Sequence, residues 1–169
     1  IYRDNKTKHN SQISEHFFVR DGLLDTISHD TFRFYPTGLI EIFVILGENN
    51  EIEGIRASTI RQIRHSTHLI DANFRADAKN RKLFMRLLNA PYRLSFQLNR
   101  MNRYGILGKY LPEFGKIVGQ MQHDLFHIYP VDVHTLEVIK NIRRLARPEM
   151  AKQFPIPSHI FKNLAKPEL

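Results

Sequence analysis

The sequence contains no cysteine and no tryptophan among its 169 residues. Without cysteine, the chain cannot form a disulfide framework, a thiolate zinc site or a cysteine nucleophile. Long apolar runs are also missing. The longest, Ile42–Leu46, is far shorter than the roughly 20 residues that cross a bilayer, and the polar N-terminal segment lacks the apolar region of a signal peptide. We therefore expect a cytoplasmic protein with no membrane span.

Several motifs that mark enzymes and nucleic-acid-binding proteins are absent as well. The sequence has no glycine-rich phosphate-binding loop, no serine in a nucleophile elbow and no pair of carboxylates after a strand. An RNP aromatic motif, a zinc finger and a helix-turn-helix are not recognisable either. Because no repeat of about 20–50 residues is visible, a solenoid or propeller is also not expected.

The length predicts about one domain, or one domain and part of another, with a radius of gyration of roughly 15 Å for a compact body. The chain starts on Ile1 and stops in a helix-like stretch, which we interpret as a piece of a longer protein. Residues 1–12 are polar and lack periodicity, so we expect a flexible linker there. Apolar groups on both sides of Asp21-Gly22 predict a short β-hairpin over residues 17–27.

After this hairpin the apolar residues follow helical spacing. Helices are expected to begin near five residues that suit a helix start, namely Pro36, Ser58, Asp77, Pro91 and Pro130. Glycines and prolines interrupt residues 106–129, which predicts short helices or turns. The prolines between 148 and 157 predict a loop before a last helix from Ser158. The predicted fold class is therefore all-α, an irregular helical bundle with one hairpin.

Positive charge is concentrated in the middle of the chain. The formal net charge is +8, and residues 55–103 contain 11 Lys and Arg but only two acids. The cationic side chains Arg61, Arg64, His65 and His68 are predicted to lie on the helix face opposite the apolar residues. Such a face can bind phosphates or an acidic protein surface, or it can be a solvated face that pairs with acids elsewhere. The two arginines argue against a divalent metal at the two histidines.

The richest group of ionisable residues lies between His123 and Leu136. His134 follows Val131 by three residues and precedes Val138 by four, so we expect it to face the buried stripe of the long helix. A histidine there is either a satisfied core residue or a metal ligand. His123-Asp124 looks like a metal-binding dyad, but it follows polar residues in a broken region and not an apolar helix, so we assign it no metal.

Four stretches of the sequence together resemble one protein family. They are Gly119-Gln-Met-Gln-His-Asp-Leu-Phe-His127 with its continuation to Thr135, Ser58–His65, Arg81–Phe84 and Asn102–Pro112. Through them, residues 17–146 resemble the bifunctional uridylyltransferase/uridylyl-removing enzymes of the PII nitrogen-signalling protein. The resemblance implies a cytoplasmic bacterial protein with a nucleotidyltransferase domain, a helical connector, an HD-type phosphohydrolase domain and two ACT domains.

The resemblance also implies an activity and a division of this chain. Members of the family transfer UMP from UTP to a tyrosine of PII when glutamine is low, and hydrolyse it off when glutamine is high, with Mg²⁺ or Mn²⁺. Residues 13–120 would be the connector and residues 121–169 the start of the HD domain. His134 would match the first histidine of the metal set. UTP and glutamine would be bound by other domains, so this chain alone should contain no catalytic residue.

Two alternatives stay open at the level of sequence. A non-catalytic basic helical module would bind RNA or an acidic protein through residues 55–103. A logarithm of the RNA binding constant that falls linearly with the logarithm of the salt concentration would support this alternative, although the missing recognition modules make nucleic acid the less expected partner. A related nucleotidyltransferase–HD protein that acts on another substrate is the second alternative.

Overall fold

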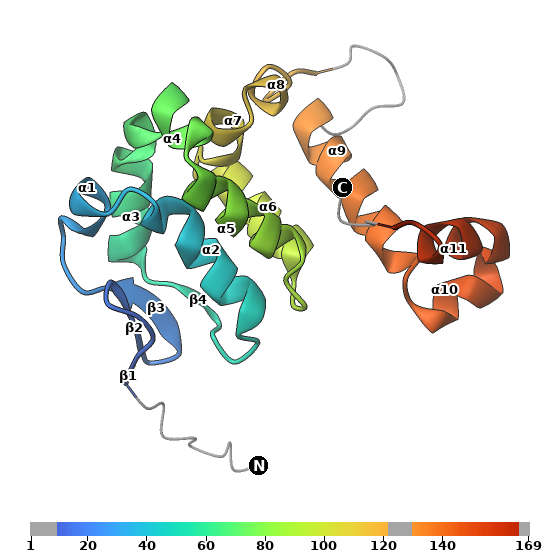
Figure 1. Ribbon diagram of the computed structural model, residues 1–169, viewed down its shortest axis with the longest axis horizontal. Coiled ribbons are helices and arrows are strands. Elements are labelled where there is room, and N and C mark those ends of the chain that lie inside the picture. Colours follow the sequence, from blue (N-terminus) through green and yellow to red (C-terminus); the bar gives the residue numbers. More distant parts are fainter. Residues whose placement is uncertain (1–9, 122–129, 166–169) are drawn as a thin grey trace. The chain divides into compact units, whose positions relative to one another are not determined.

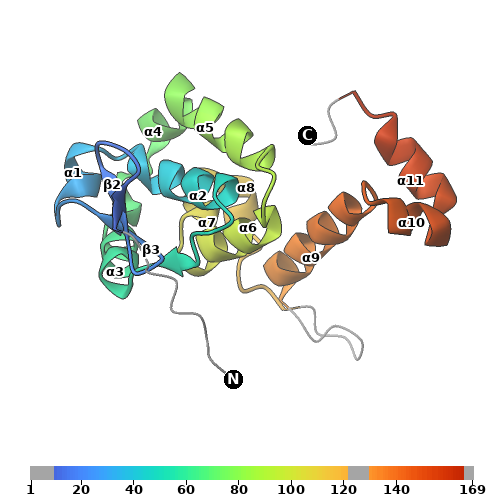
Figure 2. The same ribbon diagram turned by 90° about the horizontal axis from the view of Figure 1, so that it is seen from below.

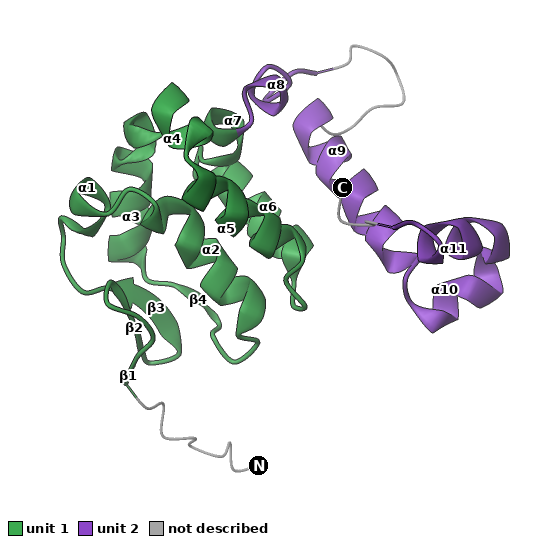
Figure 3. Ribbon diagram, in the orientation of Figure 1, with its two compact units in different colours: residues 1–110 green, residues 111–169 purple. Residues whose placement is uncertain are grey.

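The computed structural model describes residues 10–121 and 130–165. They belong to two compact units, Ile1–Tyr110 and Leu111–Leu169 (Figure 3). The division falls inside the stretch that glycines and prolines interrupt. Within the described ranges, every helix is too short or too polar to cross a membrane.

Unit 1 opens with a small sheet whose strand order is β1-β2-β3-β4. The strands are β1 (Ser11–Gln12), β2 (Phe17–Arg20), β3 (Leu23–Thr26) and β4 (Gly54–Ile55). β2 and β3 pair antiparallel, and the turn residues Asp21 and Gly22 both have positive φ, 53° and 77°. Two successive residues of positive φ suit the right-handed twist of a tight hairpin. The predicted hairpin is therefore confirmed.

The two outer strands of the sheet were not predicted. β1 lies at the end of the predicted linker and pairs antiparallel with β2, and β4 pairs parallel with β3. Each has only two residues, so neither can show the alternating pattern from which a strand is predicted. Each is defined only by its pairing with one strand of the hairpin.

The rest of unit 1 is helical, which confirms the predicted fold class. Its helices are α1 (Thr31–Phe34), α2 (Gly38–Glu48), α3 (Ala57–His65), the 3-10 helix η1 (Thr67–Leu69), α4 (Ala72–Ala76), α5 (Ala78–Leu88), α6 (Leu94–Arg103) and α7 (Leu107–Tyr110). Figures 1 and 2 both show α2 beside α5 and α6, and these helices are in contact.

Helix α2 is the centre of the core of unit 1. Every residue from Gly38 to Gly47 is buried except Glu41. Neighbouring elements cover α2 on nearly all sides, so this helix can be apolar all round, and it contains the longest apolar run of the sequence. Leu87 of α5 and Met101 of α6 are both completely buried, and a fully buried side chain of this size contributes about 1.5–3 kcal/mol relative to an exposed one.

Most predicted helix ends in unit 1 agree with the structure. Asp77 caps α5 by accepting a hydrogen bond from the backbone N–H of Lys79. Gly105, at φ 82°, follows α6 and lets the chain turn, as helix-ending glycines do. The prediction that Ser58 caps a helix is wrong, because α3 already begins at Ala57. The backbone N–H of Arg56 donates to Leu24 of β3 at 3.0 Å, so the pairing with β3 determines where α3 starts.

Unit 2 consists of α8 (Pro112–Gly115), α9 (Val131–Arg144), α10 (Pro148–Gln153) and α11 (Pro155–Lys162), of which α10 and α11 pack together. The short α8 and the long α9 agree with the prediction. The predicted loop at the prolines is wrong, because Pro148 and Pro155 are the first residues of α10 and α11. Proline suits this position, where its missing N–H would have had no helical partner.

Candidate functional site

Helix α3 presents a cationic face to solvent. Thr59 and Ile63 are buried, and the helix packs against β3. Arg61, Arg64 and His65 on the other side are exposed, as is His68 in η1. The predicted placement of these four side chains is confirmed. The face follows from helical periodicity, which places residues three and four apart on one side.

Some cations of residues 55–103 pair with acids from outside that segment. Arg56 lies 3.4 Å from the carboxylate of Asp21 and 3.5 Å from that of Asp25. Nε and one terminal nitrogen of Arg86 donate to the two carboxylate oxygens of Glu48, at 2.5 and 2.6 Å. Part of the charge excess is therefore compensated in the fold, and the basic segment is not one continuous free surface.

The arginines of α3 differ from these pairs. Neither Arg61 nor Arg64 forms an ion pair with a carboxylate of residues 10–121 or 130–165. Both are exposed. Helix α3 therefore carries cationic charge that no carboxylate of the described residues pairs with.

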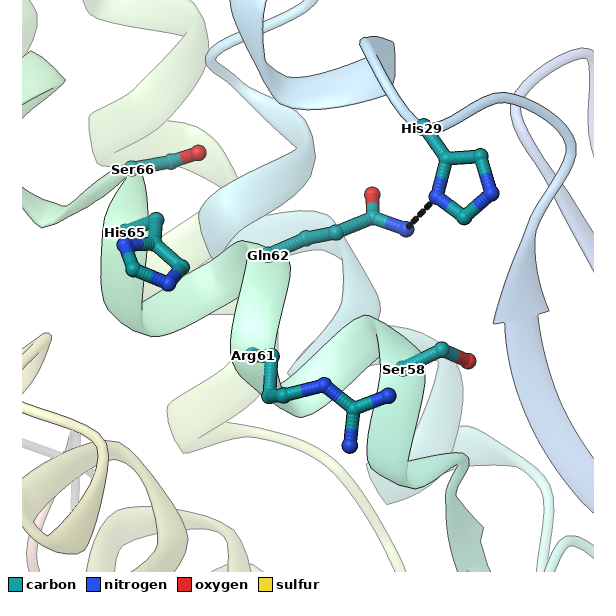
Figure 4. Close-up of a pocket in the computed structure, with 6 residues that line it drawn as sticks. All are labelled: His29, Ser58, Arg61, Gln62, His65 and Ser66. Carbon is teal, nitrogen blue, oxygen red and sulfur yellow. Dashed lines mark hydrogen bonds between the residues drawn. The ribbon is translucent and has the colours of Figure 1, made fainter.

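A surface pocket of about 350 Å³ lies beside this helix. It is lined by His29, Ser58, Arg61, Gln62, His65 and Ser66 (Figure 4). His29 comes from the turn between β3 and α1, and the other residues come from α3 and the residue after it. Each lining side chain carries a hydrogen-bond donor or can carry one, and none is a carboxylate. The lining therefore suits an anion with several acceptor oxygens.

The wall of the pocket is held by a short hydrogen-bonded chain. The hydroxyl of Thr26, at the end of β3, donates to Oε1 of Gln62 at 3.2 Å. The amide nitrogen of Gln62 then lies 3.4 Å from Nδ1 of His29 (Figure 4). Because Thr26 occupies the amide oxygen, Gln62 presents its NH₂ group toward His29.

A buried threonine connects α3 to β3 beneath this wall. The hydroxyl of Thr59 donates to the carboxylate of Asp25 at 2.5 Å and accepts from the backbone N–H of Thr26 at 3.4 Å. Asp25 also interacts with Arg56. Its negative charge is thus engaged by Thr59 and Arg56 and does not neutralise Arg61.

A second cavity of about 420 Å³ has a different electrostatic character. It is lined by Glu41, Lys79, Lys82, Leu83 and Arg86. One buried oxygen of Glu41 has no hydrogen-bond partner. A hydrogen bond with Tyr35 raises the pKa of Lys79, with the charge of Glu41 adding to the effect. This cavity is also net positive, with three cations against one carboxylate, but it differs from the pocket beside α3 in having a carboxylate in its lining.

In unit 2, His134 lies on an exposed face of α9. The predicted buried stripe of this helix is wrong: Val138 and Ile142 are 43% and 46% exposed, whereas Asp132 and Leu136 are buried. The carboxylate of Asp132 accepts a hydrogen bond from the backbone N–H of Gly119 at 3.1 Å. This polar contact, which sequence reasoning missed, holds the Asp132 side of α9 against the preceding turn. The sequence did contain a signal for the role of Asp132, because an acid in the first turn of a helix is stabilised there and often accepts hydrogen bonds from backbone N–H groups.

The described residues do not place His134 in a complete metal site. Within residues 10–121 and 130–165 there is no group of three or more His, Cys, Asp or Glu side chains that could hold a metal ion. The dismissed pair His123-Asp124 lies outside the described residues.

Comparison with known proteins identifies similar sequences over nearly the whole chain. The family model described as the uridylyltransferase GlnD third domain matches residues 17–110, and so ends where unit 1 ends. A bifunctional uridylyltransferase/uridylyl-removing enzyme of Nitrosococcus oceani is 52% identical over 161 residues, which cover 95% of this chain and 18% of that protein. Proteins of the same description from Pseudomonas aeruginosa and Azotobacter vinelandii are 52% and 53% identical over 157 residues, or 93% of this chain.

The chain spans about 17–18% of the length of these relatives. No solved structure is significantly similar to it.

Proposed function

Because this chain belongs to the family of bifunctional uridylyltransferase/uridylyl-removing enzymes, we propose that it is the helical connector of such an enzyme together with the first part of its hydrolase domain. The observation that carries the proposal is the match of the third-domain model to residues 17–110, all within unit 1. Unit 2 would then open an HD-type phosphohydrolase domain.

The proposed activity belongs to the longer protein. It transfers UMP from UTP to a tyrosine of the PII signal protein and removes that UMP by hydrolysis, in the cytoplasm and in response to glutamine. UTP and glutamine bind to other domains. The connector contributes no catalytic residue, so the 169-residue chain alone should neither transfer nor hydrolyse UMP.

The surface of unit 2 supports its assignment to a larger domain. Large apolar side chains are exposed on α9 (Val138 and Ile142) and on α11 (Ile156 at 72% and Ile160 at 58%). Clusters of exposed apolar side chains are typical of surfaces that another part of a protein covers. The rest of a hydrolase domain would cover them.

His134 is the described residue that would hold the divalent metal of the hydrolase, Mg²⁺ or Mn²⁺. Its imidazole is exposed on the same helix as Val138 and Ile142, and a neutral imidazole is a common metal ligand. A bound divalent ion would lower the pKa of a water molecule and offset negative charge on the phosphate oxygens. No group of three or more ligand side chains occurs among the described residues, so further ligands would come from elsewhere in the longer protein.

The test is to replace His134 with Ala in the full-length enzyme that contains this chain. Removal of UMP from uridylylated PII should be abolished, while transfer from UTP stays close to that of the unmodified enzyme. His159→Ala is the matched control because His159 is also exposed in unit 2 and has no assigned role. His123→Gln should likewise leave both reactions unchanged.

Two results would contradict the proposal. If His134→Ala retained removal activity, the metal assignment would be wrong while the family assignment would stand. If the full-length enzyme neither transferred nor removed UMP on PII, the proposed reaction itself would be wrong.

A further inference from the structure

The pocket beside α3 has no role in the proposed reactions, and its chemistry points to a ligand of its own. We propose that the pocket formed by His29, Ser58, Arg61, Gln62 and His65 binds the phosphate group of a small phosphorylated molecule. The inference rests on residues of unit 1 alone and does not depend on the proposed function.

The first argument is the type of side chain that surrounds the pocket. A guanidinium, two imidazoles, two hydroxyls and an amide are all able to donate hydrogen bonds, and the lining includes no carboxylate. A phosphate group offers several acceptor oxygens in a small volume. Arginine binds such groups in a bidentate manner, and hydrogen bonds to an ionised acceptor are about twice as strong as neutral ones.

The second argument is that the cation of the pocket is available. Arg61 forms no ion pair with a carboxylate of the described residues. Asp25, which contacts α3 through Thr59, already interacts with Thr59 and Arg56. An incoming anion would therefore not have to displace a carboxylate from Arg61.

The third argument is preorganisation. Gln62 is fixed between the hydroxyl of Thr26 and the ring of His29. In Figure 4 the side chains of Ser58, Arg61 and Gln62 extend from α3 toward the side on which His29 lies. Two segments that are far apart in the sequence thus supply donors to one pocket, and because Gln62 is already held, less side-chain freedom would be lost on binding than at a site of mobile side chains.

The size of the pocket favours a small ligand over a polymer. Its volume of about 350 Å³ lies near the lower end of the roughly 300–1,000 Å³ typical of small-molecule sites. It has room for a phosphate group and part of the molecule that carries it. Free phosphate and a phosphomonoester share the recognised group, and the experiment distinguishes them.

The experiment is a titration of the 169-residue chain, labelled with ¹³C and ¹⁵N, observed through the ring signals of His29 and His65 by NMR. The ligands are inorganic phosphate, UMP and uridine, each at constant ionic strength maintained with NaCl. Phosphate and UMP should shift the ring signals saturably, and uridine should not. Tighter binding of UMP than of phosphate would identify a phosphomonoester as the source, and equal or weaker binding would identify free phosphate.

Arg61→Gln is the decisive variant, and Arg64→Gln is its matched control. Both arginines are exposed on α3, but only Arg61 lines the pocket. Arg61→Gln should raise the dissociation constant for phosphate at least about tenfold, as expected for loss of a hydrogen bond to a charged group. Arg64→Gln should weaken binding clearly less, because Arg64 does not line the pocket and exposed charges that make no direct hydrogen bond contribute little. Circular dichroism of both variants checks that the helices are retained.

Three outcomes would overturn the proposal. One is no saturable shift with phosphate or UMP. Another is that Arg61→Gln and Arg64→Gln weaken phosphate binding equally, which would mean that phosphate is attracted diffusely to the basic face and not bound in the pocket. The third is binding of uridine as tight as that of UMP, which would mean that the phosphate group is not what the pocket recognises.

Discussion

The hydrogen bonds of Thr59 should determine how firmly α3, and with it the phosphate pocket, is held against β3. Thr59 is completely buried, and Thr59→Val replaces its hydroxyl by a methyl group of similar volume. The substitution removes the 2.5 Å hydrogen bond to Asp25 and the 3.4 Å hydrogen bond from the backbone of Thr26. Hydrogen bonds to charged groups contribute about 1.5–3 kcal/mol each.

The expected cost lies toward the lower end of that range. Asp25 keeps two other partners, Arg56 at 3.5 Å and the backbone N–H of Thr26 at 3.0 Å, so its carboxylate is not left unpaired. We therefore expect Thr59→Val to lower the free energy of unfolding by about 2 kcal/mol. Thr59→Ser keeps the hydroxyl and loses one methyl group, which should cost about 1 kcal/mol.

Urea unfolding followed by near-UV circular dichroism can measure this difference. The chain has no tryptophan, and five of its six tyrosines lie in residues 1–110, so the signal mainly follows unit 1. A double-mutant cycle with Asp25→Asn should give a coupling energy of roughly 1 kcal/mol, as contacting residues do. If Thr59→Val were no more destabilising than Thr59→Ser, or if the coupling were absent, the reasoning would be wrong.

Two further predictions concern the core and the ionisation of unit 1. Leu87→Ala should destabilise unit 1 by about 2–5 kcal/mol in the same urea assay, because Leu87 of α5, which packs on α2, is completely buried and its truncation leaves a cavity. Its neighbour Leu88 is half-buried, so Leu88→Ala should lower the free energy of unfolding clearly less. Equal costs for the two substitutions would contradict the described core. Burial raises the pKa of Tyr110 above its ordinary 10.0, opposed by the charge of Arg81. Its neutral form is thus favoured in the fold, so the stability linked to it is present below pH 10 and is lost as the pH rises. The ultraviolet difference between the chain and Tyr110→Phe should titrate with a midpoint above 10, and a midpoint at or below 10 would refute the burial effect.

Much of unit 1 could be predicted from local signals. The positive φ of Asp21-Gly22, the cap at Asp77 and the ending at Gly105 each depend on a residue type at one position. The cationic face of α3 could be predicted because helical periodicity alone separates Arg61 and Arg64 from the buried Ile63.

The orientation of α9 could not be predicted in the same way. The apolar residues Val131, Val138 and Ile142 suggested a buried stripe, yet Val138 and Ile142 are exposed. Periodicity identifies an apolar face but does not tell which partner covers it. In the described part of unit 2, the hydrogen bond from Gly119 to Asp132 places another face inward.

The sequence by itself thus determined the helical class, the hairpin, the concentration of charge between residues 55 and 103, and the family, because each depends on residues that are near one another or in a fixed order. Tertiary structure alone decided which cations remain unpaired and which side chains meet. Arg56 and Arg86 pair with acids 35 and 38 residues away, and the phosphate pocket joins His29 to Gln62 across 33 residues. Contacts over such separations arise from the packing of α3 on β3 and of α5 on α2, and no local pattern in the sequence encodes them.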